Sequence, residues 1–404
     1  QIFNGLNTWL LGAVNKLSKN NRSIDYMLTT NIMKNRIVKA LIMLTCMTSC
    51  THNHNGDYNY TEEYINLNKV TDAITNDVVD SISYLGLPDI NGNIPVNVNK
   101  LYVVNGTIYI GDCWRSKVFA YDRKSGVPKF VLDSRGSGPE EYLEIRSIAI
   151  DSAAIYIVDN YTQRMMVYDS NDGSYIRTMK MPVIADDVET LDDGGFIFAY
   201  IPMKGVKLAI DQPESRLFVV DKDLKIRDSY QEVKDGIYDA IGQRTIFSRC
   251  DQGIVFSTAS IDGFFIIDPK DPSKQTLIRL PFTNGLEGKR DVVPDEISDY
   301  QHLSSVPYVC GDNIYISYTS DKGHGESVLW NSRYNGILQN SSDDLSKALI
   351  PIVGTDDGCL IGMVDDYETY SYMIEQGFAK APNNVSQLLK DGSGIALVFY
   401  KMKK

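Results

Sequence analysis

Two aspartates spaced 47 residues apart are the first candidates for chemistry. Asp112 follows the apolar run 108–111, and Asp159 follows the matching run 155–158. A further acid, Asp365 or Asp366, follows a similar run near the C-terminus. If the ends of these runs surround one axis, converging carboxylates would hold Ca²⁺ and support metal-assisted hydrolase or lyase chemistry. Aspartate also ends strands by capping turns, and we favour this reading because other runs lack an equivalent acid.

Aromatic side chains that follow the same kind of run are candidates for ligand contact. The chain holds 25 Tyr and 3 Trp. Rings at the ends of strands stack on sugars or clamp a peptide. Most of the tyrosines are instead expected to pack between strands. The candidate contacts are Trp114, Tyr161, Tyr200 and Tyr318.

A glycine-rich loop at 135–142 carries two charged candidates. Its glycines permit positive φ, and Pro139 fixes its own φ, so Arg135 or Glu141 would be held rigidly toward a ligand. In the alternative, the loop is a strut in which Arg135 and Glu141 pair locally. We favour the strut because a linker between structural units has a geometric role whatever the protein binds.

Histidine and cysteine form no catalytic constellation in the sequence. The chain contains no His-Glu-x-x-His helix, paired-cysteine metal motif or Gly-x-Ser-x-Gly elbow. His52 and His54 lie in a polar stretch where solvation is favoured over metal binding, and His302 and His324 are expected in solvated loops. Buried free thiols are expected at Cys113, Cys250, Cys310 and Cys359.

The elements that would position these side chains repeat along the chain. A shift of 47 residues places 108–112 on 155–159 and Gly126 on Gly173. Short β-branched and aromatic runs at this period are typical of propeller blades, because each blade is a sheet that cannot bury both faces alone. The sequence therefore predicts an all-β fold, a six-bladed β-propeller of four-stranded antiparallel blades. The predicted second strands begin near 108, 155, 196, 254, 314 and 359.

The last blade is predicted to close the ring with strands from both ends of the chain. Its second strand is followed by residues 367–390, which indicate a short helical or irregular insertion. The strand pattern returns at 395–400, which we expect to be the third strand. The run 81–85 would then be the outermost strand, since such closure removes an exposed edge. In the alternative, residues 57–98 form a separate small domain.

The N-terminal region predicts export and a lipid anchor. Residues 33–49 combine a cationic start, a short apolar run and small residues before a cysteine, as in a lipoprotein signal peptide. Cys50 is the predicted lipidation site, although Met47 departs from the usual motif, and an ordinary secretory signal with a chance cysteine is the alternative. We expect a non-native or mis-called upstream segment at 1–32, a tether at 50–77 and the propeller at 78–404.

The chain from Cys50 onward is acidic, with 34 Lys and Arg against 51 Asp and Glu and a net charge of −17. This charge argues against nucleic acid as a partner and against electrostatic docking on anionic lipid. The expected contact with the membrane is therefore through acyl chains at Cys50 alone.

The segment 132–142, followed by 148–151 and 155–159, resembles the six-bladed β-propeller lipoproteins of Bacteroides and relatives. That family is similar to NHL-repeat and TolB-like propellers. Its most specific piece is the Gly-x-Gly-Pro-x-Glu-Tyr loop, in which Glu140 stands where the family usually has Gly. The resemblance implies an exported protein, lipid-anchored at the outer membrane. Because no acidic run resembling a surface-export signal follows Cys50, the periplasmic side is expected.

Two functions from different classes remain. The first is a binding or scaffold protein that holds a glycan, peptide or envelope partner on the propeller face and the loops 284–306 and 319–328. The second is a calcium-assisted hydrolase or lyase with its site in the axial channel. We favour the first because enzymatic propellers use clusters of histidines and acids, which cannot be assembled from this sequence. Calcium is the one cofactor that the candidate residues Asp112 and Asp159 suggest.

Overall fold

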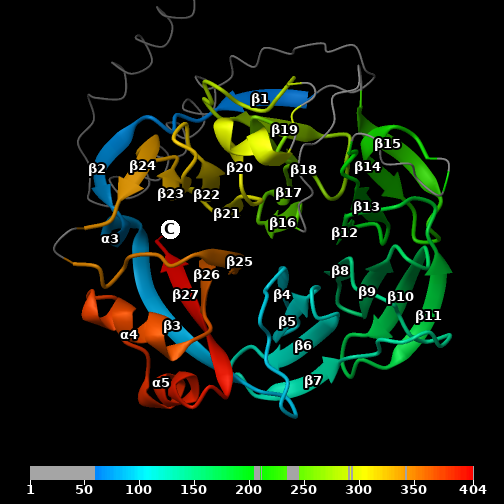
Figure 1. Cartoon of the computed structure of the whole chain (residues 1–404), viewed down its shortest axis with the longest axis horizontal. Coiled ribbons are helices and arrows are strands. Elements are labelled where there is room, and N and C mark those ends of the chain that lie inside the picture. The colour runs from blue at the N-terminus through cyan, green and yellow to red at the C-terminus, as the bar shows by residue number, and fades with distance from the viewer. Residues whose placement is uncertain are drawn as a thin grey trace, which may run out of the picture. The chain divides into compact units, whose positions relative to one another are not determined.

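The computed structural model of the chain describes residues 60–203, 210, 212–233, 245–289, 292, 294–341 and 344–403. These residues form six twisted sheets around a central axis (Figure 1). Each sheet contains an antiparallel meander of four strands, and the first strands β4, β8, β12, β16, β21 and β25 face the axis (Figure 1). The predicted six-bladed β-propeller is therefore confirmed.

Blades 1 to 3 follow the chain in simple order. Blade 1 consists of β4 (Lys100–Val104), β5 (Thr107–Asp112), β6 (Lys117–Asp122) and β7 (Pro128–Leu132). Blade 2 consists of β8 (Ser147–Ile150), β9 (Ala154–Asp159), β10 (Arg164–Asp169) and β11 (Tyr175–Lys180). Blade 3 consists of β12 (Asp187–Thr190), β13 (Phe196–Ala199), β14 (Ser215–Val220) and β15 (Ile226–Glu232).

Blades 4 and 5 each gain an extra strand from the N-terminal part of the chain. Blade 4 consists of β16 (Phe247–Cys250), β17 (Gly253–Phe256), β18 (Gly263–Ile267) and β19 (Gln275–Arg279). Blade 5 consists of β20 (His302–Leu303), β21 (Tyr308–Cys310), β22 (Asn313–Thr319), β23 (Gly325–Asn331) and β24 (Gly336–Gln339). Outside them, β1 (Tyr60–Tyr64) runs parallel to β19, and β2 (Val70–Ile74) runs parallel to β24.

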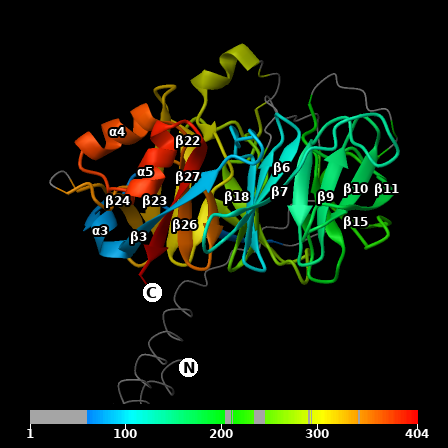
Figure 2. The same cartoon turned by 90° about the horizontal axis from the view of Figure 1, so that it is seen from below.

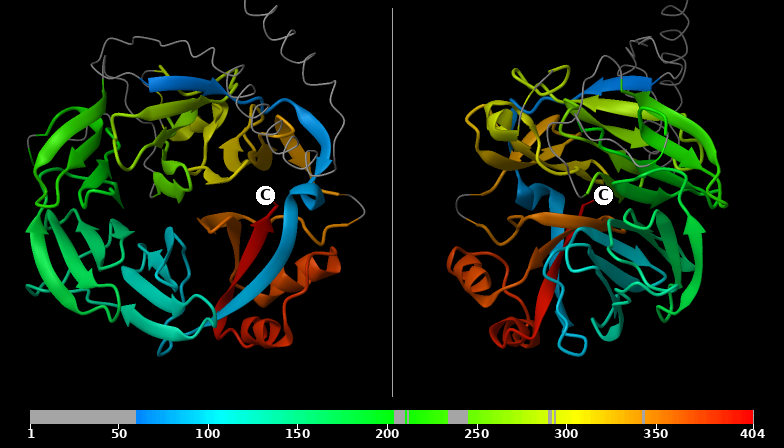
Figure 3. Two further views of the ribbon diagram at one scale, coloured as in Figure 1. Left: turned by 180° about the vertical axis from the view of Figure 1, so that it is seen from behind. Right: turned by 45° about the vertical axis from the view of Figure 1, so that its right-hand side comes forward.

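Blade 6 closes the ring with both ends of the chain. Its strands are β25 (Ile352–Asp356), β26 (Cys359–Val364), β27 (Gly394–Met402) and β3 (Val79–Pro88). The C-terminal β27 is the third strand, and the N-terminal β3 pairs with it along its length (Figure 3). The predicted closure is therefore confirmed, and the alternative of a separate domain at 57–98 is wrong.

The predicted tether at 50–77 is wrong for its second part. Residues 60–77 hold β1, β2 and most of the short helix α3 (Thr75–Val78), and they cover the outer edges of two blades. These segments are polar and short, so the sequence pattern resembles a linker. Their order comes from ladder hydrogen bonds with β19 and β24, which lie more than 200 residues away. The signal peptide, Cys50, His52 and His54 lie outside the described residues.

The ring has two distinct ends. The turns between first and second strands lie at one end, which we call the hairpin face. The turns between second and third strands, together with the linkers between blades, lie at the other end, which we call the linker face. Figure 2 shows the C-terminus at the hairpin face and α4 (Tyr367–Glu375) toward the linker face.

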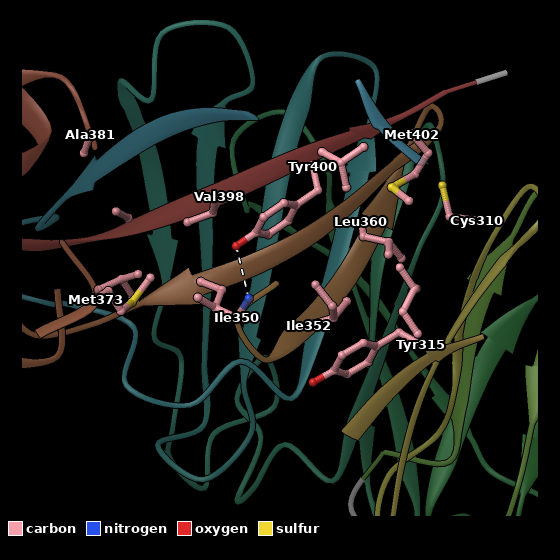
Figure 4. Packing of buried hydrophobic residues seen from close by; sticks show 14 of the residues in the cluster. Cys310, Tyr315, Ile350, Ile352, Leu360, Met373, Ala381, Val398, Tyr400 and Met402 are labelled. Carbon is pink, nitrogen blue, oxygen red and sulfur yellow. Dashed lines mark hydrogen bonds between the residues drawn. The ribbon is translucent and has the colours of Figure 1, made fainter. Parts of the chain in front are cut away.

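The region predicted as a helical insertion forms α4 and α5 (Asn383–Lys390). Both helices cover blade 6, where Met373 and Ala381 pack with Val398, Leu360 and Ile352 in one buried cluster (Figure 4). In the same cluster the Tyr400 hydroxyl accepts a hydrogen bond from the Ile350 N–H at 3.1 Å (Figure 4). A 3₁₀ helix, η1 (Pro294–Asp299), precedes β20. None of the helices formed by the described residues is both long and apolar enough to span a membrane.

Candidate functional site

Asp112 and Asp159 are fully buried and bind backbone groups at the linker face. The Asp112 carboxylate accepts hydrogen bonds from the N–H groups of Val96 and Asn97 at 3.0 and 3.3 Å, and from Arg115 at 3.1 Å. The Asp159 carboxylate accepts the Leu143 N–H at 2.9 Å and both donors of Thr162. Each aspartate therefore ties the turn after a second strand to the linker that enters the same blade.

This geometry matches the capping interpretation. The oxygens of Asp112 and Asp159 already accept hydrogen bonds from the chain, and Asp366 accepts the Thr369 N–H as the N-cap of α4. Among the described residues, no group of three or more His, Cys, Asp or Glu side chains is arranged to hold a metal ion. The calcium hypothesis for Asp112 and Asp159 stays a prediction.

The glycine-rich loop is braced from within. The Glu141 carboxylate accepts the Gly138 N–H at 2.7 Å, and Arg135 Nε donates to the Leu143 carbonyl at 3.2 Å. Tyr142 is fully buried, and its hydroxyl bonds Ser116 and Ser134 backbone atoms at 3.0 and 3.1 Å. Arg135 and Glu141 thus each bind the loop backbone, whereas local pairing between them was expected.

The four candidate aromatic contacts divide into two pairs. Trp114 and Tyr161 are 62% and 75% exposed, in the turns that follow β5 and β9. Tyr200 is half-buried against the blade 2 and blade 3 core. Tyr318 lies inside β22, is buried, and packs its ring against Phe282 with centroids 5.9 Å apart. The long β22 carries Tyr318 into the core, and its predicted ligand contact stays a prediction.

Trp114 and Tyr161 are both exposed at the linker face, in the adjacent blades 1 and 2. They occupy equivalent turns, one repeat apart. Val96 and Leu143, in the linkers that Asp112 and Asp159 hold, are 40% and 39% exposed. We call these four residues the aromatic surface; Arg135, bonded to the Leu143 carbonyl, lies at its edge.

A second candidate site lies on the ring axis. A cavity of about 390 Å³ is lined by side chains from the first strands of all six blades. Within it, Lys100 and Tyr102 of β4 meet Glu189 of β12 and Arg249 of β16. The cavity brings together residues separated by more than 140 positions in the sequence.

These groups form one ion network across the ring. Lys100 Nζ lies 2.9 Å from Asp187 Oδ1 and 3.2 Å from Glu189 Oε1. The Tyr102 hydroxyl donates to the same Glu189 oxygen at 2.6 Å, and Arg249 Nε donates to the other at 2.8 Å. Asp187 also accepts two backbone N–H groups of blade 4, at 2.7 and 2.8 Å. Ser147 Oγ of blade 2 also donates to Asp187, so the network joins blades 1 to 4.

The charges in the network hold one another ionised. Burial lowers the pKa of Lys100, but Asp187 and Glu189 outweigh it, so the pKa lies above its ordinary value. Burial raises the pKa of Glu189, but Lys100 and Arg249 outweigh it, so that pKa lies below its ordinary value. Burial and the nearby carboxylates raise the pKa of Tyr102 well above its usual range. None of these three groups is poised to exchange a proton near neutral pH.

Sequence reasoning missed this network because it followed the second strands. The pattern gave one usable signal. Asp187 and Glu189 flank Val188 in β12, a short strand whose every position is buried, and the buried Lys100 opens β4. Charged residues are almost never fully buried unless paired, so charges inside first strands indicate a shared partner across the axis. The partner itself cannot be identified from one strand.

The described histidines and cysteines differ in their burial. His302 is buried in β20, with Nδ1 2.9 Å from the Tyr300 carbonyl, so its predicted place in a solvated loop is wrong because the β20 ladder places it against β22. His324 is exposed in a turn, as predicted. The thiols of Cys113, Cys310 and Cys359 are free and buried, and Cys250 is free and half-buried.

Comparison with solved structures supports the fold. A Bacteroides fragilis protein described as a candidate for export superposes with a TM-score of 0.65 at 16% identity, covering 85% of this chain and all of its own. The hydrazine synthase of Kuenenia stuttgartiensis matches with a TM-score of 0.33 at 15% identity, over 60% of this chain and 69% of its own. The glutaminyl cyclase of Myxococcus xanthus matches with a TM-score of 0.34 at 11% identity, over 64% of this chain and 94% of its own.

At 16% identity, the likeness to the Bacteroides fragilis protein shows the fold alone. No curated protein matches the sequence. One family model, described as a domain of unknown function (DUF4934), matches residues 62–395. The match begins in β1 and ends in β27, so it spans all six blades and the closing strands. This chain therefore belongs to the DUF4934 family.

Proposed function

We propose that this protein is a binding or scaffold propeller of the cell envelope that holds a glycan or peptide on the aromatic surface. The observation that carries the proposal is the pair of exposed rings at equivalent turns, Trp114 and Tyr161. The Asp112 and Asp159 carboxylates accept hydrogen bonds from the N–H groups of the adjacent linkers and fix them, so the rings stand on a rigid base. Aromatic rings on a rigid base provide stacking area at low entropic cost.

Trp114 makes this proposal testable by fluorescence. Trp330 is buried, so Trp114 is the exposed tryptophan among the described residues. We expect an oligosaccharide or peptide from a mixed panel to shift the emission of the full chain, and Trp114→Ala and Tyr161→Ala each to weaken that binding by about fivefold or more. Tyr372→Ala, which removes a ring 63% exposed on α4, is the matched control. Equal binding by all variants would contradict the proposal.

Export and anchoring form a second part of the proposal. The relative described as a candidate for export, the sequence of residues 33–50 and the resemblance to the six-bladed propeller lipoproteins of Bacteroides, which are similar to NHL-repeat and TolB-like propellers, support the proposal. The protein would be lipid-anchored at Cys50, on the periplasmic side of the outer membrane. Labelling cells with a fatty-acid analogue should mark the wild type and leave Cys50→Ser unmarked. Protease treatment of intact cells should spare the protein, whereas digestion would place it on the cell surface.

The alternative of a calcium-assisted hydrolase or lyase has less support. The carboxylates of Asp187 and Glu189 in the axial channel are bonded to Lys100, and Glu189 also to Arg249. Metal analysis of the purified protein tests the alternative directly. Stoichiometric Ca²⁺ in the wild type that is lost in Asp112→Ala and Asp159→Ala would favour it over the binding role.

A further inference from the structure

The inner part of the axial cavity is neutral. Lys100 and Arg249 supply two positive charges, and Asp187 and Glu189 supply two negative charges, all within one network. A ligand therefore meets no excess charge there. What distinguishes this part of the cavity is a set of hydrogen-bond donors without acceptors.

Two such donors line the cavity. Tyr308 lines the cavity, and its hydroxyl has no hydrogen-bond partner in the described ranges. Arg249 uses Nε and Nη2 on Glu189 and Thr190, while Nη1 has no partner within the described part of the chain, and the side chain is 35% exposed. Both donors would bind a carbonyl or carboxylate oxygen of a ligand.

The hairpin-face end of the cavity is acidic. Its ionisable lining residues there are Asp151, Asp251, Asp356 and Asp357. Asp356 is neutralised by Arg123 at 2.7 Å. Asp251 and Asp357 are exposed, and among described residues neither carboxylate forms an ion pair, while Lys401 Nζ donates to the Asp357 backbone carbonyl. This end of the cavity therefore attracts positive charge and repels anions.

We propose that the axial cavity binds a small cationic ligand of about dipeptide size, with an ammonium or guanidinium group at the acidic end and a carbonyl or carboxylate oxygen at Tyr308 and Arg249. The volume of about 390 Å³ lies within the usual range for small-molecule sites. The acidic end lies at the hairpin face, whereas the aromatic surface lies at the linker face. This site is therefore independent of the proposed glycan or peptide site, and either can fail alone.

Calorimetric titration of the full chain with lysyl-lysine and with glutamyl-glutamate at low ionic strength tests the proposal. Lysyl-lysine should bind, and its affinity should fall with added salt, while glutamyl-glutamate should not bind. Asp251→Asn and Asp357→Asn should each weaken lysyl-lysine binding about two- to fivefold, and the double variant about tenfold. Tyr308→Phe should weaken it about two- to tenfold.

The variants are chosen to keep the fold. Asp251, Asp357 and the Tyr308 hydroxyl have no side-chain partner among described residues, so thermal unfolding should match the wild type. Asp321→Asn is the matched control, because Asp321 is exposed in the turn between β22 and β23 at the linker face. The proposal is overturned if lysyl-lysine does not bind, if glutamyl-glutamate binds as tightly, or if the Asp251 and Asp357 variants bind like Asp321→Asn.

Discussion

Two groups of buried carboxylates in this ring differ in what satisfies them. At the linker face, Asp112 and Asp159 accept hydrogen bonds mainly from backbone N–H groups no more than 16 residues away. On the axis, Asp187 and Glu189 bind Lys100, and Tyr102 donates to Glu189 from 87 residues away. The first group ties a turn to a linker within one blade, and the second group joins blade 3 to blades 1 and 4.

This difference predicts which substitutions should lower the stability of the ring most. Removal of a capping carboxylate leaves uncharged backbone N–H groups without their acceptor, which costs about 1–3 kcal/mol. A network member that is removed leaves an uncompensated charge in a buried site, which is far more costly.

Lys100→Met should be the most destabilising change. It leaves Asp187 and Glu189, which are 0% and 1% exposed, without their shared cation. Breaking a buried ion pair by removing one partner costs about 3–5 kcal/mol, which urea unfolding would measure. Lys117→Met is the matched control, because Lys117 pairs with Asp133 at a surface position and should cost about 1 kcal/mol or less. Equal losses in the two variants would remove the contrast.

Acid should weaken the same network from the carboxylate side. The pKa of Glu189 is lowered in the folded protein, so its contribution is present above the ordinary value of 4.5 and is lost as pH falls through the folded value. The wild type should therefore lose stability in this range, and Glu189→Gln should show a flatter acid limb. Unfolding midpoints across the acid range measure this, and parallel curves for the two proteins would contradict it.

Asp112→Ala and Asp159→Ala should each cost about 2 kcal/mol. Each removes the acceptor of several donors at a buried position, and such losses are typically about 1–3 kcal/mol. Because the two sites are equivalent repeats, their losses should agree closely and should add in the double variant. A loss that appears only when calcium is present would instead indicate a metal site.

Gly126→Ala should cost about 1 kcal/mol more than Gly173→Ala, its counterpart one repeat later. Both glycines have positive φ, of 73° and 74°, so the backbone penalty is shared. An added Cβ at Gly126 would lie 2.2 Å from the Gly86 carbonyl oxygen in β3, whereas at Gly173 it would meet the Phe130 ring at 3.0 Å. A ring shifts more easily than the backbone of the closing strand. Thermal unfolding of the two variants gives the difference.

Trp114→Ala should have the smallest effect on stability, less than about 0.5 kcal/mol, because the ring is largely exposed. The same denaturation assay applied to Tyr318→Ala should show a clear loss, since that ring is buried against Phe282. Similar losses in both would mean that Trp114 packs in the fold and is unavailable to a ligand.

The sequence predicted the elements that obey the repeat and missed those that depend on distant pairing. The second strands, the closing strands and the insertion were found because apolar period and turn residues are local signals. The sequence predicts a tether where β1 and β2 lie, because the strands that pair with them are more than 200 residues away. Trp114 and Tyr161 lie in exposed turns, as the sequence predicts. Tyr318 and His302 were expected beyond the ends of strands, but they lie inside β22 and β20 and are buried.

The axial site could not be predicted for the same reason. The network draws one residue from each of three blades: Lys100, Glu189 and Arg249. The sequence around any one of them does not identify the other two as its partners. Only the ring brings them together. A charged residue within a predicted first strand indicates that the residue is buried and paired. Its partner can be identified only from the folded structure.

A double-mutant cycle on Lys100→Met and Glu189→Gln tests the central contrast most directly. The account predicts a coupling of about 1.5–3 kcal/mol in the free energy of unfolding, because the second change removes the charge that the first leaves unpaired. The companion cycle on Lys100→Met and Asp112→Ala should be additive to within about 0.5 kcal/mol. Additive losses in the first cycle would contradict an ion network that joins the blades across the axis.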